Sequence, residues 1–383
     1  MRKIAVVTGT RAEFGIMRHI LQQIRSDAEL QLQLLVTGAH LLPQYGMTVD
    51  EIREAGFDID EELDIVFASN SRQAAARSAG IACMEFADAF QRLKPDILLV
   101  LGDRYEIFAA VSAAMLMNIP IAHISGGEVT EGAQDEQMRH AITKMAHIHF
   151  AGAEAYADNI RKMGEESWRI NLVGEPGLEN IRKMNFLSVE LLKEKYKIEV
   201  DKDTLLVTFH PVTLELEQLS DHFQNLLSAL EKIQKRVIFT YPNADAGSQY
   251  IIEELLKFKE HNDNVYVFEN LGSELYLNVM KLCGAVVGNS SSAIIEAPFL
   301  KVPVVDIGNR QKGRLKAANI IECGYSEEEI KMSIDKALSR EFAERCTNTS
   351  SLYGDGETSI KIAEILKNVP LGEKLLKKRL SWS

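Results

Sequence analysis

An asparagine, three consecutive serines and a lone glutamate follow an apolar run in the stretch "VVGNSSSAIIEAP", residues 286–298. The apolar residues up to Gly288 predict a strand, and the serines begin a helix. The first N–H groups of a helix lack partners within it, so these amides, the serine hydroxyls and the helix dipole favour a phosphate. One serine could equally serve as a plain helix cap. Glu296 lies four residues after Ser292, one too many for a capping box, and its carboxylate could accept both hydroxyl hydrogens of a sugar diol. The stretch therefore predicts a site for phosphate and ribose.

Three other apolar runs in this half of the chain also end in polar residues. His210 stands in "FHPVT", Asn243 in "YPNADAG", and Arg310, Lys312 and Arg314 in "DIGNRQKGR". Arginine grips phosphate with a fork of donors, although basic residues in a solvated loop and a structural histidine would give the same pattern. Polar groups at four strand ends favour a binding edge.

Carboxylates follow the apolar runs of the amino-terminal half. Asp103 stands in "GDRYE", while Glu128 and Asp135 stand in "HISGGEVTEGAQDEQMRH"; Arg11 follows the first run, in "TGTRAEFG". Carboxylates crowded over a small pocket repel one another, which raises some of their pKa values and suits them to proton transfer. The plainer alternatives are a helix cap for Asp103 and an ion pair between Asp135 and Arg139, which lie four residues apart. The histidines are dispersed, so no metal site is expected.

Two series of short apolar runs must position these residues. The first covers residues 3–9, 32–38, 97–103, 119–127 and 147–153, and the second covers residues 204–211, 235–243, 265–271, 284–289 and 301–310. Segments with helical periodicity lie between most of them, which predicts an α/β fold of two doubly wound, Rossmann-like domains in tandem. Ligands bind beyond the carboxyl ends of such strands, so we expect a cleft between two facing domains. The predicted boundaries are 1–175 and 176–365, with a terminal helix at 366–383 that packs back on the first domain.

Length and charge limit the possible partners. The 383 residues suit two domains, and a net charge of −12 opposes nonspecific binding to nucleic acid or an anionic membrane. The sequence has no apolar run near the ~20 residues that span a bilayer, and its amino terminus lacks the apolar region of a signal peptide. Four scattered cysteines without a CxxC pair predict neither disulfides nor a zinc site. These features indicate a reducing cytoplasm.

Seven motifs together resemble the hydrolysing UDP-N-acetylglucosamine 2-epimerases over roughly residues 1–365. They are "TGTRAEFG", "GDRYE", "HISGGEVTEGAQDEQMRHAITKMAH", "FHPVT", "PNADAG", "GNSSSAIIEAP" and "IGNRQKGR", in the family's order. The resemblance implies a glycosyltransferase-B-like fold, a UDP-sugar substrate, no redox cofactor, a homodimer and the first step of sialic-acid-type sugar synthesis.

The resemblance also implies roles for individual residues. It places Ser290, Ser291, Arg310 and Arg11 at the diphosphate, Glu296 at the ribose, Asn243, His210 and Arg104 at the nucleotide sugar, and Asp103 and Asp135 in catalysis, with His210 a further catalytic candidate. Many sialic-acid-pathway relatives carry a catalytic glutamate where this chain has Ser125. Glu128 is then the nearest remaining candidate for the second acid or base.

This chemistry would convert UDP-N-acetylglucosamine to N-acetylmannosamine and UDP. The hydrogen on carbon 2 is not beside a carbonyl, so its removal requires that the bond from carbon 1 to oxygen break as the proton leaves. A glycal-like alkene forms, an acid protonates carbon 2 from the other face, and water adds at carbon 1. The nearest alternative is the same reaction on UDP-2,4-diacetamido-2,4,6-trideoxyglucose, of the legionaminic acid pathway, which Ser125 favours. A non-hydrolysing epimerase, a glycosyltransferase and a noncatalytic sensor are more remote alternatives.

Overall fold

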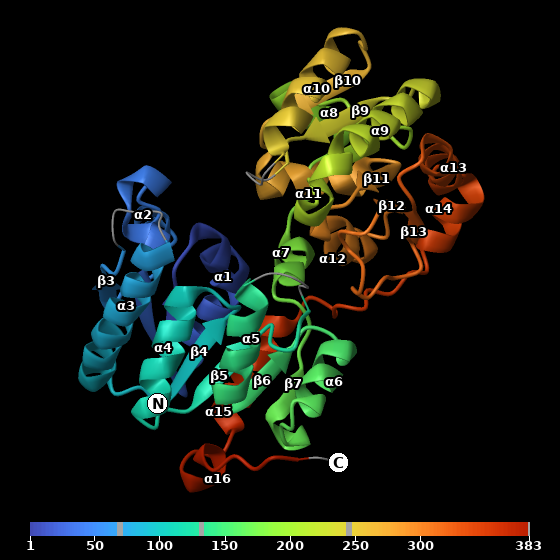
Figure 1. Ribbon diagram of the computed structural model, residues 1–383. Helices are drawn as coiled ribbons and strands as arrows, with labels where there is room; N and C mark the ends of the chain where they lie inside the picture. The colour runs from blue at the N-terminus through green and yellow to red at the C-terminus, as the bar shows by residue number, and fades with distance from the viewer. Residues whose placement is uncertain (67–71, 130–133, 243–246, 382–383) are drawn as a thin grey trace. The chain divides into compact units, whose positions relative to one another are not determined.

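The computed structural model describes residues 1–66, 72–129, 134–242 and 247–381. The chain divides into two compact units (Figure 1). The first unit comprises residues 1–182 and 353–383, and the second comprises residues 183–352.

The described part of the first unit forms a seven-stranded parallel sheet in the order β3-β2-β1-β4-β5-β6-β7. Its strands are β1 (Arg2–Thr8), β2 (Leu30–Thr37), β3 (Glu61–Leu63), β4 (Ile97–Leu101), β5 (Ile121–Ile124), β6 (Ile148–Ala151) and β7 (Ile170–Leu172). Its helices are α1 (Arg11–Ser26), α2 (Val49–Glu54), α3 (Arg72–Leu93), α4 (Tyr105–Leu116), α5 (Gln134–Met145), α6 (Glu154–Lys162), α7 (Gly177–Lys183), which ends at the unit boundary, α15 (Thr358–Asn368) and α16 (Glu373–Leu376).

Helices cover both faces of this sheet because its central strands are apolar on both sides. Alternate residues of a strand point to opposite faces, so Ile4 and Val6 belong to one buried cluster and Ala5 and Val7 to another. Helices α1 and α15 pack on the first face, whereas α3, α4 and α5 pack on the second. Burial on both faces is typical of parallel sheets.

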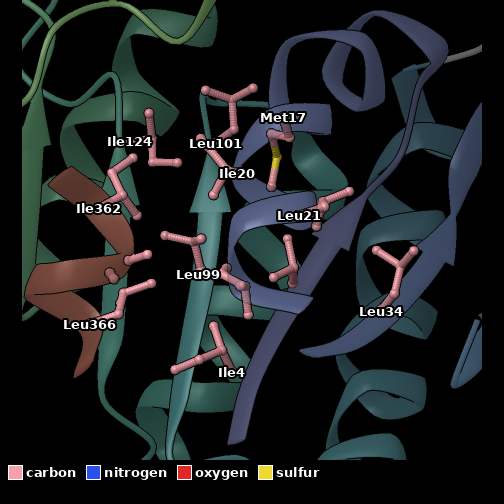
Figure 2. Close-up of a cluster of buried hydrophobic side chains, with 14 of the residues drawn as sticks. Ile4, Met17, Ile20, Leu21, Leu34, Leu99, Leu101, Ile124, Ile362 and Leu366 are labelled. Atoms are coloured by element: carbon pink, nitrogen blue, oxygen red, sulfur yellow. The ribbon is translucent and has the colours of Figure 1, made fainter. Parts of the chain in front are cut away.

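The carboxyl-terminal segment returns to the first unit. In Figure 2, Ile362 and Leu366 of α15 lie on the same side of the sheet as Met17 of α1. The chain therefore rejoins the first unit at residue 353, earlier than the expected position 366, because α15 buries its apolar face in that core. The buried guanidinium of Arg169 then holds the tail by donating to the carbonyls of Leu375 at 2.7 Å and of Lys377 at 3.0 Å.

The described part of the second unit forms a six-stranded parallel sheet in the order β10-β9-β8-β11-β12-β13. Its strands are β8 (Leu205–Thr208), β9 (Val237–Thr240), β10 (Val265–Phe268), β11 (Ala285–Gly288), β12 (Val304–Ile307) and β13 (Ile320–Cys323). Its helices are α8 (Val189–Tyr196), α9 (Leu219–Ile233), α10 (Ser248–Glu260), α11 (Gly272–Leu282), α12 (Ser291–Phe299), α13 (Glu327–Ala337) and α14 (Arg340–Cys346). Helices α9, α10 and α13 share one buried cluster with the strands.

The predicted α/β fold of two doubly wound units is confirmed, and each of the ten apolar runs overlaps a strand. Strands β3, β7 and β13 were not predicted, because each has only three or four residues, at a sheet edge and with polar positions. No helix in the described ranges combines the length and apolar character needed to cross a membrane.

Candidate active site

The switch point of the second sheet lies between β8 and β11, where the strand order reverses and ligands of doubly wound sheets collect. Strand β11 ends at Gly288, whose φ is +133° and at which a Cβ atom would stand 2.0 Å from the carbonyl oxygen of Thr208. Only glycine fits so close to the neighbouring strand. The chain then turns at Asn289, whose carbonyl accepts from Arg310 Nη1 at 3.0 Å and Gln311 Nε2 at 2.8 Å.

Helix α12 begins beside this switch point. Ser290 is its N-cap, and the Ser290 hydroxyl accepts the N–H of Ser292 at 3.4 Å. One of the serines therefore does cap the helix, which was the alternative to a phosphate-binding role. Ser291 is the first residue of the helix. Ser292 in turn donates its hydroxyl to Glu296 Oε2, and burial raises the pKa of the Glu296 carboxyl above its usual range. The first turns of α12 thus carry two serine hydroxyls, of Ser290 and Ser292, and the carboxyl group of Glu296.

A cavity of about 400 Å³ opens in the second unit at this point. His210, Ser290, Ser292 and Glu296 line it, together with residues 269–273, which lead into α11, and Tyr276 within that helix. Burial raises the pKa of the Tyr276 phenol to about 12, so the phenol stays protonated at neutral pH. The volume falls within the ~300–1,000 Å³ of small-molecule sites. Such a lining suits a sugar ring with free hydroxyls, near an anion at the start of α12.

Hydrogen bonds of Tyr325 hold the loop that carries Arg310. The Tyr325 hydroxyl donates to Glu215 Oε2 at 2.6 Å and accepts the N–H of Asn309 at 3.2 Å. Asn309 Nδ2 also donates to Glu215 Oε1 at 3.1 Å. These bonds, which we call the Tyr325 clasp, join the loops that follow β8 and β12.

The switch point of the first sheet lies between β1 and β4. Asp103 follows β4 and its side chain is 18% exposed. Asp103 Oδ2 forms an ion pair with Nη2 of Arg139, a buried residue of α5 whose Nη1 also donates to the carbonyl of Glu128 at 3.1 Å. Arg139 therefore joins the end of β4 to the loop after β5. Its partner is Asp103, whereas the sequence spacing had suggested Asp135.

Arg104 belongs to a second charged cluster at the same switch point. Its Nη2 donates to Glu106 Oε1 at 2.8 Å, and its Nε lies 3.8 Å from Glu13 Oε1. Glu13 also accepts the N–H of Gly9 at 2.7 Å and completes a capping box with Thr10. Burial raises the pKa of Glu13 to about 7 despite these bonds and the charge of Arg104.

The remaining candidates of the first unit lie nearer solvent. Arg11 is the first residue of α1, is 73% exposed and forms an ion pair with Glu51 at 2.9 Å. Asp135 is exposed in the first turn of α5, and Glu128 is partly buried. Within the described ranges, no group of three His, Cys, Asp or Glu side chains could hold a metal ion.

The structure thus brings some predicted residues together and leaves others apart. His210, Ser290 and Glu296 share the cavity of the second unit, with Arg310 bound to the adjacent Asn289. Ser291 is not part of the cavity lining. Arg11 and Arg104 line a cavity of the first unit. Asn243 lies outside the described residues.

Sequence reasoning missed Glu13, Glu106 and Tyr276. The Thr-x-x-Glu spacing of the capping box would have singled out Glu13, at a strand end that was already of interest. Glu106 stands inside the quoted "GDRYE". Tyr276 sits in the middle of α11, and only tertiary packing brings it to the cavity, so no local signal marks it.

Comparison with known proteins agrees with this architecture. Residues 22–367 match the family described as UDP-N-acetylglucosamine 2-epimerase. A Campylobacter jejuni protein named GDP/UDP-N,N'-diacetylbacillosamine 2-epimerase (hydrolyzing) is 39% identical over 97% of this chain and 96% of its own. A Legionella pneumophila protein named UDP-N,N'-diacetylbacillosamine 2-epimerase (hydrolyzing) is 34% identical over 99% of each chain. The crystal structure of a Neisseria meningitidis UDP-GlcNAc 2-epimerase bound to UDP-GlcNAc has a TM-score of 0.80 at 20% identity, over 95% of this chain and 99% of the other.

Proposed function

The chain belongs to the UDP-N-acetylglucosamine 2-epimerase family, and on this premise we propose that it hydrolyses and epimerises UDP-2,4-diacetamido-2,4,6-trideoxyglucose. This sugar nucleotide is UDP-N,N'-diacetylbacillosamine. The products are UDP and the free sugar inverted at carbon 2. The family supports a hydrolysing UDP-sugar 2-epimerase in general, and the identity of the sugar is the finer part of the proposal.

The cavity of the second unit is the observation that carries the proposal. Glu296, held by Ser292, lies within α12, while Ser290, whose hydroxyl accepts the N–H of Ser292, stands at the start of that helix. A ribose diol bound to the carboxylate would leave the diphosphate near the helix start, where the dipole and Arg310 stabilise its charge. These contacts strengthen as the bond to UDP breaks, since charge then develops on the leaving oxygen.

The carboxylates of the first unit supply the proton chemistry in this proposal. Asp103 takes the proton from carbon 2 while the bond from carbon 1 to oxygen breaks and UDP leaves with the electron pair. A second carboxyl group, Glu128 or Asp135, protonates carbon 2 of the alkene from the opposite face. Water then adds its hydroxyl to carbon 1 and gives its remaining proton to the second carboxyl group, while Asp103 releases the carbon 2 proton to solvent. The sugar nucleotide and water thus yield the free sugar, UDP and one proton, with both carboxyl groups restored.

The choice of sugar rests on the relatives. The sequence alone favours UDP-N-acetylglucosamine first and the diacetamido sugar second, whereas the Campylobacter jejuni and Legionella pneumophila relatives, at 39% and 34% identity, carry the diacetylbacillosamine name. Ser125 stands at a position where many sialic-acid-pathway relatives carry a glutamate, and this difference also favours the diacetamido sugar. UDP-N-acetylglucosamine therefore becomes the second candidate.

Product analysis in heavy water tests both parts of the proposal. The protein is incubated separately with the two sugar nucleotides, and products are identified by mass and by comparison with authentic 2-epimers. We expect UDP and a free sugar carrying one deuterium at carbon 2, with the diacetamido substrate consumed faster. UDP release that required an added acceptor would indicate a glycosyltransferase and contradict the proposal. Faster use of UDP-N-acetylglucosamine would contradict the choice of sugar alone.

We also propose a homodimer and a reducing cytoplasm. The four cysteines are unpaired, and the thiols of Cys283 and Cys346 are buried, which fits a chain that does not depend on disulfides. Sedimentation analysis of the purified protein would test the dimer.

A further inference from the structure

A second cavity, of about 580 Å³, lies in the first unit beyond the ends of β1, β2 and β4. Leu42, Tyr45, Val66 and Tyr105 give it apolar walls, and the polar side chains of Gln44 and Ser78 lie among them. Its volume is that of a small-molecule site. The cavity adjoins the proposed chemistry, because Arg104 lines it and directly follows Asp103.

The charges of this cavity are already neutralised. Arg104 is bound to Glu106 and lies beside Glu13, and Arg11 is paired with Glu51. A phosphate would have to displace these carboxylates, whereas an uncharged group would not. The cavity therefore suits an amide or an apolar substituent better than an anion.

Tyr45 supplies an exposed part of the apolar wall. It ends a short 3-10 helix, Pro43–Tyr45, which Gly46 closes with φ of +87°. Tyr45 is 56% exposed, although it lines the cavity together with Leu42. An apolar group placed against this ring would be favoured, whereas a sugar hydroxyl there would lose bonds to water.

We propose that this cavity binds the carbon 4 to carbon 6 edge of the sugar and selects an acetamido group and a methyl group over two hydroxyls. The inference rests on the proposed function. The two candidate substrates differ only at this edge, since both carry UDP at carbon 1 and an acetamido group at carbon 2. The methyl groups of the diacetamido sugar pack on Tyr45 and Leu42, and the polar atoms of Gln44 and Ser78 face the second amide. A hydroxyl-bearing edge gains neither contact.

Substitution of the exposed wall tests the inference. Tyr45→Ser removes the apolar surface at an exposed position, and Tyr266→Ser, at an exposed position of β10 in the second unit, is the matched control. The ratio of kcat/KM for the diacetamido substrate to that for UDP-N-acetylglucosamine is measured for both variants and the wild type. We expect this ratio to fall about tenfold or more in Tyr45→Ser, as the loss of hydrophobic pocket contacts predicts, and to stay unchanged in Tyr266→Ser. UDP affinity measured by calorimetry should be unchanged in both.

The possible failures are distinguishable. A wild type that prefers the diacetamido substrate, together with an unchanged ratio in Tyr45→Ser, would overturn the specificity role and leave the proposed function standing. An equal loss on both substrates, or a matching loss of UDP affinity, would likewise overturn it, because it would show a structural effect. A wild type that prefers UDP-N-acetylglucosamine would overturn the choice of sugar and this inference together.

Discussion

The side-chain amide of Asn289 bonds to both backbone groups of His210: Oδ1 accepts the N–H at 2.7 Å, and Nδ2 donates to the carbonyl at 2.9 Å. Asn289 is fully buried, and its own carbonyl accepts from Arg310 and Gln311. Through its side chain and its backbone carbonyl, Asn289 therefore ties together the loops after β8, β11 and β12. These loops carry His210, Ser290 and Arg310, three of the predicted nucleotide-binding residues.

Replacement of Asn289 by alanine should destabilise the second unit. The change would leave the buried N–H and carbonyl of His210 without their partners, and each unsatisfied group costs ~1–3 kcal/mol. We expect the free energy of unfolding to fall by about 3 kcal/mol, measured by circular dichroism in urea. Asn262→Ala, at a less buried amide that caps α10 through Phe258, is the control. A loss no larger than that of the control would contradict the assigned role.

Replacement of Glu296 by alanine should weaken nucleotide binding. Hydrogen bonds to a charged group contribute roughly 1.5–3 kcal/mol, so loss of the carboxylate should raise the Kd for UDP by about 10- to 100-fold. Ser292→Ala, which removes only the hydroxyl bound to Glu296, should have a smaller effect. Calorimetry with UDP measures both. Unchanged affinity in Glu296→Ala would remove this residue from the ribose site.

Replacement of Asp103 by asparagine should abolish turnover and spare UDP binding. The amide keeps the shape of the side chain and can still accept from Arg139, but it cannot take a proton. General base catalysis contributes about 10²- to 10⁴-fold, and UDP release should slow by at least that factor. Asp158→Asn, on the exposed face of α6, should retain full activity. A near-normal rate in Asp103→Asn would exclude Asp103 from the proton transfer.

Much of the fold follows from the sequence, because buried parallel strands are continuous apolar runs between periodic helices. Strands of this kind, such as β4 (Ile97–Leu101), need no tertiary information to be found. Edge strands such as β7 carry polar residues, and only pairing with a neighbour makes them strands. The return of α15 to the first unit also depends on tertiary packing, because its apolar face would suit either core.

The candidate site could be predicted where residues directly follow a strand. His210, Ser290 and Asp103 all do so, and the topology brings such positions to the sheet edge. The partners of these residues could not be predicted. Arg139 reaches Asp103 from α5, and Tyr325 reaches Asn309 from beyond β13, and both contacts depend on how helices and loops pack.

Removal of the Tyr325 hydroxyl should loosen the loop that carries Arg310. Tyr325→Phe loses the bond to Glu215 and leaves the N–H of Asn309 to water. If Arg310 binds the diphosphate, the looser loop must be ordered on binding, so KM should rise several-fold while kcat changes less. Tyr250→Phe, which breaks an exposed bond to Ser220 in the same unit, is the control. Steady-state kinetics that are identical for the two variants would contradict a positioning role for the clasp.

The carboxyl group of Glu13 should make the stability of the first unit depend on pH. Burial raises its pKa from the ordinary 4.5 to about 7, so the folded state holds the proton more tightly than the unfolded state. Its contribution is full below pH 4.5 and is lost as pH rises to about 7, a difference of roughly 3 kcal/mol for a shift of this size. Glu13→Gln removes the titration and should abolish this slope.

Urea unfolding at pH 4.5 and pH 8, followed by tryptophan fluorescence, measures the effect, because Trp168 belongs to the first unit. Glu154→Gln, on an exposed carboxyl of α6, is the control and should follow the wild type at both pH values. Relative to the wild type, Glu13→Gln should gain stability between the two pH values by about 2–3 kcal/mol. A constant difference between the variant and the wild type would show that Glu13 is ionised across this range, and that Arg104 and the N–H bonds of the capping box outweigh its burial.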